Sequence, residues 1–150
     1  MPALRPAEIL SLTGITCDVS EDKLGTVLRL EATRIDDALA ALQSTGYDFL
    51  VDLFGTDTGE AIELTYHVRA FATREDIYLK ALVGYDGEAP SVWHIHPAAL
   101  YAEREAAELL GMSFPGHPNP KRLLTTEDLP PMLRREHLIR GAEEVQLPYE

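Results

Sequence analysis

The spacing of hydrophobic and polar residues divides the first two thirds of the chain into short helices and strands. Residues 3–12 predict a helix that tolerates Pro6 in its first turn. Residues 16–19 and 26–32 predict two strands rich in β-branched residues, joined by the polar turn 20–25. The chain therefore opens with one helix and a pair of neighbouring strands.

An amphipathic helix is predicted next. Thr33 is a plausible N-cap because its hydroxyl can accept a backbone hydrogen bond, and Gly46 is a natural stop. Apolar residues recur at i, i+3, i+4 and i+7, which places them on one face of the helix; they are Ile35, Ala38, Leu39 and Leu42.

Three more strands follow this helix. Residues 48–54 are almost all apolar and predict a central strand that is covered on both faces. Residues 62–70 and 76–83 alternate apolar and polar positions, as half-buried strands do. Because the linkers are of hairpin size, the three strands should form an antiparallel meander. The predicted fold is a two-layer α+β domain of order α-β-β-α-β-β-β, with helices on one face of a mixed sheet.

Residues 97–110 predict a further helix, with Pro97 at its first position and Gly111 just past its end. Its apolar stripe consists of Ala99, Ala102, Ala106, Leu109 and Leu110. This helix and the elements before it form the predicted core domain, residues 1–111.

Charged residues flank the stripe of this helix. At about 100° per residue, Glu103 and Glu105 fall on its opposite borders, whereas Arg104 and Glu108 fall on the far side as an i,i+4 pair. If the stripe is buried, the two border carboxylates need basic or backbone N–H partners. The nearest basic candidates are Arg122, Arg134 and Arg135. The alternative is an ordinary solvated charged face.

The segment after Gly111 is rich in proline. Five of the ten prolines fall between Pro115 and Pro131, and proline lowers the entropy that a loop loses on ordering. Large apolar residues interleave with them, which argues against disorder. Residues 112–150 therefore predict an extended C-terminal docking arm that presses on this domain or on a partner.

Composition and charge narrow the function. The chain is 45% hydrophobic and 25% charged, has no apolar run of membrane-spanning length, and shows no signal-peptide pattern at its start. The net charge of −12 argues against nucleic-acid binding. Residues 1–102 carry 7 basic and 16 acidic groups, whereas residues 103–140 carry 6 of each. A locally neutral segment with both signs closely mixed suits a protein partner.

Catalytic and metal chemistry have weak support. His94 and His96, if on a strand, would point to one side, and His117 and Glu103 could complete a metal site. The only cysteine, Cys17, excludes an internal disulfide and a Cys-only cluster, indicates a reducing cytosolic compartment, and has no local motif for a Cys–His dyad. No nucleotide-binding or hydrolase motif occurs. The residues alone favour a non-catalytic interaction domain.

Several motifs in order resemble a known family. They are Phe49–Asp52, Pro90–Trp93, Ala102–Glu105, Leu110–Met112, Phe114, Gly116–Pro118, Arg122–Leu124, Glu127–Asp128 and Pro131–Arg135. This set resembles the 30 kDa subunit family of respiratory complex I, an NADH-quinone oxidoreductase, and its counterpart in energy-converting membrane-bound [NiFe] hydrogenases. In this chain Glu108 stands where the family usually has Asp, Leu110 where it has an aromatic residue, and the closing motif is one residue longer.

The resemblance implies a non-catalytic assembly subunit of an NADH (or ferredoxin):quinone oxidoreductase, a translocase that couples electron transfer to ion movement. It implies no cofactor or active site in this chain. The implied partners are the large quinone-site (or NiFe-type) subunit and iron–sulfur subunits, on the cytoplasmic face of the membrane. The residues expected at the partner interface are Glu103, Arg104, Glu105, Gly111, Gly116, His117, Pro118, Arg122, Arg134 and Arg135.

Overall fold

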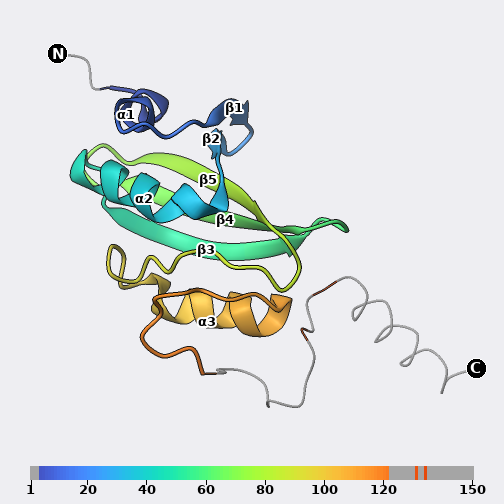
Figure 1. Ribbon diagram of the computed structural model, residues 1–150. Coiled ribbons are helices and arrows are strands. Elements are labelled where there is room, and N and C mark those ends of the chain that lie inside the picture. The colour runs from blue at the N-terminus through green and yellow to red at the C-terminus, as the bar shows by residue number, and fades with distance from the viewer. Residues whose placement is uncertain (1–3, 122–130, 132–133, 135–150) are drawn as a thin grey trace, which may run out of the picture.

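The predicted order of elements is present in the computed structural model, which describes residues 4–121, 131 and 134. Figure 1 shows a helix, a hairpin, a second helix and a meander of three longer strands, followed by a third helix. The elements are α1 (Pro6–Leu12), β1 (Asp18–Asp22), β2 (Gly25–Arg29), η1 (Ala32–Arg34), α2 (Ile35–Ser44), β3 (Phe49–Asp57), β4 (Ile62–Ala70), β5 (Glu75–Val83) and α3 (Ala99–Leu110). None of the described helices is long and apolar enough to cross a membrane.

The strands form one mixed sheet of order β1-β2-β5-β4-β3. β2 pairs with β5 in parallel, and every other neighbouring pair is antiparallel. The alternation predicted for β4 is correct, because Ile62, Leu64, Tyr66, Val68 and Ala70 are all buried on its inner face. The matching inner residues of β5 are buried beside them. The α+β fold class predicted from the pattern is thus confirmed.

The core lies between the inner face of the sheet and the helices. The predicted apolar residues of α2 are all fully buried. Tyr66, at the centre of the inner face, lies within electrostatic reach of Asp36 in α2 and Glu103 in α3. The two helices therefore approach the same part of the sheet, and α3 lies along β3 (Figure 1).

The position predicted for β3 is wrong. β3 is an edge strand, not a central one, and its residues Phe49, Val51 and Phe54 are 47%, 37% and 44% exposed. The register with β4 shifts between Leu50 and Asp52, so the strand carries a bulge at Val51. Bulges are a common device for protecting sheet edges. The apolar run at residues 48–54 therefore arises because the outer face of β3 is apolar and exposed, not because the strand is buried on both faces.

Several element boundaries also differ from the prediction. Thr33 does not cap α2, because the chain enters that helix through the 3₁₀ turn Ala32–Arg34. Pro97 precedes α3 in a turn instead of starting it, and Ala98 is the N-cap. β1 begins at Asp18 rather than residue 16, and all of it is exposed. An exposed hairpin strand is held by backbone pairing, which leaves little hydrophobic signal in the sequence.

Candidate docking site

Three motif stretches that are distant in sequence come together around α3. Residues 87–91 run beside residues 113–115, joined by hydrogen bonds such as Ala89 N–H to Ser113 O (3.1 Å) and Ser91 N–H to Pro115 O (2.9 Å). Residues 112–121 then run back along α3 (Figure 1). We call α3 together with residues 87–93 and 112–121 the α3 platform. It contains most of the residues that the sequence singled out.

Glu103 is the buried centre of the platform. Its side chain is 0% exposed and accepts hydrogen bonds from the Ser91 hydroxyl at 2.6 Å and the Val92 N–H at 3.1 Å. Burial raises the pKa of the Glu103 carboxyl, and the two hydrogen bonds oppose that rise only in part. The predicted need for partners is confirmed, and among the described residues these partners are a hydroxyl and a backbone N–H.

The neighbouring charges of α3 point in different directions. Arg104 donates from Nε to the Lys121 carbonyl at 2.8 Å, and its guanidinium lies over the Tyr101 ring. Glu105 is exposed. Glu108, predicted on the solvated side, is instead only 5% exposed. The prediction for Glu108 is wrong because the helix is covered on more than its sheet-facing stripe, which its own periodicity cannot reveal.

His117 ties the returning segment to the start of α3. Its Nε2 lies 2.8 Å from the Leu100 carbonyl, and its Nδ1 lies 3.0 Å from the Asn119 N–H. A carbonyl can only accept and a backbone N–H can only donate, so the neutral tautomer with a proton on Nε2 satisfies both contacts. Both ring nitrogens are therefore engaged, and neither is open to a metal ion.

The other two histidines of the weakly supported metal-site alternative are not paired. Residues 92–96 form a turn, not a strand, with the Ile95 and His96 N–H groups both donating to the Val92 carbonyl. His94 is exposed, whereas His96 is buried and burial lowers its pKa. Within residues 4–121, 131 and 134, no group of three or more His, Cys, Asp or Glu could hold a metal. The strand on which a one-sided His94–His96 pair depended is therefore absent from this turn.

Two glycines of the motifs adopt a left-handed backbone conformation that other residues rarely adopt. Gly116 has φ +91°, and its carbonyl accepts the Trp93 indole N–H at 3.1 Å. Gly111 ends α3 with φ +74°, where a Cβ would lie 2.6 Å from Pro131 Cγ and 2.7 Å from Arg134 Nη2. Left-handed backbone favours glycine at both positions, and close approach favours it at Gly111 as well.

Arg134 closes the C-terminal end of α3. Its Nε donates to the Leu110 carbonyl at 2.7 Å, and its Nη2 donates to the Gly111 carbonyl and to Asp86 Oδ1, each at 3.0 Å. The guanidinium also lies 4.9 Å from the centre of the Tyr85 ring. A cation that bonds the last carbonyls of a helix stabilises its negative end. Arg122 and Arg135, also predicted for this site, lie outside the described residues.

The platform also encloses a pocket of about 370 Å³ between α3 and the returning segment. Met112, Phe114 and Ala107 supply its apolar wall, and Glu103, Arg104 and His117 supply polar atoms that are already bonded. Pro118 and Glu105 are exposed at the surface of the platform, where Trp93 and Tyr101 are 37% and 60% exposed. The arrangement consists of a braced interior and an aromatic, mixed-charge exterior.

Comparison with known proteins places the chain, though not these features individually, in a family. Residues 28–143 match the model of the respiratory-chain NADH dehydrogenase 30 kDa subunit. The C subunit of the NADH-quinone oxidoreductase of Moorella thermoacetica is 39% identical over 89 residues, which cover 57% of this chain and 60% of that protein. The chain therefore spans less than two thirds of this relative.

Two solved structures share the fold. A trypsin-resistant fragment of Nqo5 superposes with a TM-score of 0.66 at 23% identity, covering 75% of this chain and 94% of that one. A chain of the membrane-bound sulfane sulfur reductase, an archaeal respiratory membrane complex, gives a TM-score of 0.77 at 20% identity, covering 93% and 88%.

Proposed function

The chain belongs to the family of the 30 kDa subunit of the respiratory-chain NADH dehydrogenase, and we propose that it is a non-catalytic assembly subunit of a complex I-type NADH:quinone oxidoreductase. In this role it docks on the large quinone-site subunit and supports neighbouring iron–sulfur subunits on the cytoplasmic face of the membrane. The reaction of the complex, electron transfer coupled to ion translocation, is carried out by those neighbours.

The observation that carries this proposal is that the polar side-chain atoms of the motif residues are hydrogen-bonded to other parts of the same chain. Glu103, Arg104, His117 and Arg134 each bond backbone or hydroxyl groups of a segment distant in sequence. A catalytic acid, base or nucleophile needs a face open to a substrate. These side chains instead brace the platform, which supports a structural role for them.

The exterior of the platform suits a protein partner. Trp93, Tyr101 and Arg104 belong to the residue types that dominate binding energy in interfaces, and Tyr101 and Arg104 are in contact. The segment 103–140, which begins in the platform, carries 6 basic and 6 acidic groups within a chain of charge −12, and closely mixed charges of both signs suit a protein partner. We therefore propose the exposed aromatic rim of the platform as the contact surface for the large subunit.

Co-purification with a tagged large subunit tests the proposal. Arg104→Ala removes both the bond to Lys121 and the stacking on Tyr101, and Tyr101→Ser removes a side chain that is 60% exposed. We expect each variant to lower the recovered chain at least about tenfold, the loss typical of one interface anchor. Lys23→Ala, in the exposed β1–β2 turn, is the matched control and should leave recovery unchanged.

Deletion of residues 112–136 should abolish recovery altogether. Wild-type recovery of both point variants would refute the docking role. Metal analysis of the recovered large subunit distinguishes the two types of assembly, because bound nickel would identify a hydrogenase-like complex instead of a quinone-reducing one.

A further inference from the structure

β5 extends beyond the strand that pairs with its outer edge. The parallel register between β2 and β5 ends at Arg29 and Lys80, and the last contact of this kind is the Leu30 N–H to the Lys80 carbonyl at 3.1 Å. β5 continues for three more residues, Ala81 to Val83, still paired with β4 on the other side. This edge lies away from α3, because β4 and β3 stand between them.

The free backbone groups on this edge belong to Leu82. Successive residues of a strand direct their N–H and C=O to opposite sides, so Leu82 repeats the direction of Lys80, whose carbonyl points toward β2. In the described part of the chain no hydrogen bond joins either Leu82 backbone group to residues 30–34, where the parallel ladder would have continued. Strand edges with unpaired N–H and C=O groups are templates for another strand.

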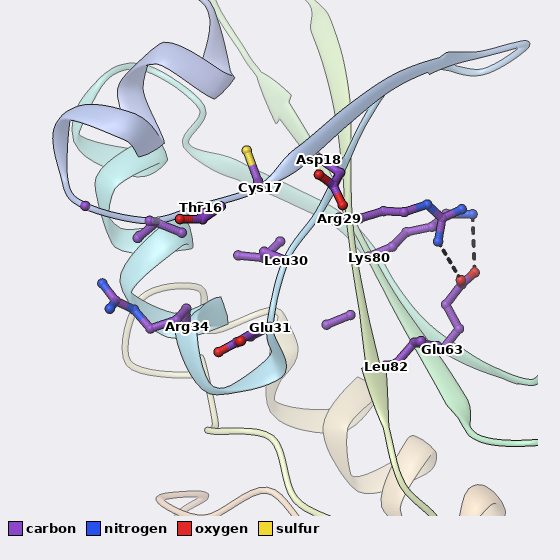
Figure 2. A pocket seen from close by; sticks show the side chains of 13 residues that line it. Thr16, Cys17, Asp18, Arg29, Leu30, Glu31, Arg34, Glu63, Lys80 and Leu82 are labelled. Carbon is purple, nitrogen blue, oxygen red and sulfur yellow. Dashed lines mark hydrogen bonds and ion pairs between the residues drawn. The ribbon is translucent and has the colours of Figure 1, made fainter.

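A hollow of about 610 Å³ lies directly beside this edge (Figure 2). Its walls come from the linker before β1, from the turn after β2, and from the end of β5; Cys17, Leu30 and Leu82 are among the lining residues. Leu82 is itself 61% exposed. The space is therefore bounded by main chain on both sides and contains an apolar side chain that nothing described covers.

Three of the charged residues that line the hollow are paired with one another, whereas Asp18, Glu31 and Arg34 also line it and take no part in this trio. Glu63 accepts from Arg29 at 2.9 Å and lies 3.4 Å from Lys80 Nζ, as the dashed lines in Figure 2 show. An occupant with a strong charge of its own would gain no free partner in this trio. An extended main chain is complementary to the free edge, and an apolar side chain is complementary to Leu30 and Leu82 in the hollow.

We propose that an extended segment of a neighbouring subunit adds as a short strand to the β5 edge. Its main chain pairs with the Leu82 N–H and C=O, and one apolar side chain enters the hollow beside Leu30 and Leu82. This mode of recognition takes affinity from backbone hydrogen bonds and specificity from a side-chain pocket. That the occupant is a subunit of the same complex rests on the proposed function above. The free edge is observed independently of that function.

Amide hydrogen exchange, measured residue by residue, tests the proposal. In the isolated full-length chain, the Leu82 amide should exchange much faster than those of Ala81 and Val83, which are directed toward β4. In the complex purified through a tag on the large subunit, exchange at Leu82 should slow about tenfold or more. Exchange at Phe71, an exposed apolar residue between β4 and β5, should not change.

The variant Leu82→Pro removes an N–H that the sheet does not use together with the exposed leucine side chain beside the hollow, and proline is tolerated at such edge positions. It should melt near the wild-type temperature and lower the yield of assembled complex, whereas Phe71→Ala should not. Three results would overturn the edge proposal. The first is slow exchange of the Leu82 amide in the isolated chain, and the second is exchange at the same rate in the complex as in the isolated chain. The third is exchange in the isolated chain that becomes slower as the concentration of that chain rises. The last result would identify a second copy as the occupant. Failure of the complex to form at all would overturn the proposed function instead.

Discussion

Replacement of Glu103 separates the two contributions of this buried carboxyl, its hydrogen bonds and its charge. The side chain is 0% exposed, accepts two hydrogen bonds, and holds the 91–92 turn against α3. Glu103→Ala leaves the buried Val92 N–H without an acceptor, which costs about 1–3 kcal/mol. It also removes one methylene group, Cγ, from the interior, at a cost of about 0.8 kcal/mol.

The expected loss for Glu103→Ala is therefore about 2–4 kcal/mol. In a chain of 150 residues, each kcal/mol lowers Tm by about 2–4 °C, so the expected fall is about 10 °C. Glu103→Gln keeps an acceptor for Val92 and removes the buried charge. It should stay within about 1 kcal/mol of wild type at pH 7.

The pH dependence gives the sign of the charge effect. Burial raises the pKa of Glu103 in the folded chain, so the folded state binds this proton more tightly than the unfolded state. The stability from this group is fully present below the unfolded pKa of about 4.5 and is lost as the pH rises through the folded pKa. Glu103→Gln should remove this loss.

Urea unfolding of wild type, Glu103→Gln and Glu103→Ala between pH 4.5 and 8 measures both effects. The reasoning is refuted if the glutamine variant is as unstable as the alanine variant at pH 7, or if its stability keeps the same slope with pH as wild type. Co-purification with the large subunit should follow stability, so the glutamine variant should remain able to dock.

Two further predictions concern other parts of the fold. Arg134→Ala should lower the free energy of unfolding by about 2 kcal/mol, because charged hydrogen bonds to Leu110, Gly111 and Asp86 are lost. Thermal denaturation measures this loss. A Tm within about 2 °C of wild type, which corresponds to about 1 kcal/mol or less, would contradict the capping role. Burial lowers the pKa of His96, so its contribution to stability is present above the unfolded pKa of about 6.5 and is lost as the pH falls below it. His96→Leu should make unfolding less sensitive to pH between 7.5 and 5, and an unchanged sensitivity would show that His96 does not stay neutral in the fold.

The sheet illustrates what hydrophobic pattern can and cannot determine. β4 and β5 alternate apolar and polar residues, and the structure buries their predicted faces against the core. The other face is mostly only partly exposed, and Thr65 on it is buried. β3 is apolar on both sides, and this pattern alone does not distinguish a strand covered twice from an edge strand with an exposed apolar face. Only the pairing order, which depends on contacts far apart in sequence, places β3 at the edge.

The platform shows the same limit at the level of single residues. The helical wheel of α3 places Glu103 at the border of the buried stripe, and its need for partners follows from the cost of burying a charge. The wheel does not find Ser91 and Val92 as the partners, because they belong to a turn fixed by tertiary contacts. It misplaces Glu108 for a related reason, since periodicity within one helix contains no information on what covers its other side.

The three consecutive charges of α3 act on three separate surroundings because successive helical residues diverge by about 100°. Glu103 points inward and fixes the turn before the helix, Arg104 reaches the segment that returns after the helix, and Glu105 faces solvent. Since 87–93 and 112–121 are also bonded to each other, the first two contacts close a loop of interactions around one helical turn. A partner that meets the outer side of this turn therefore meets a surface whose shape is set before binding, which reduces the entropy lost on docking.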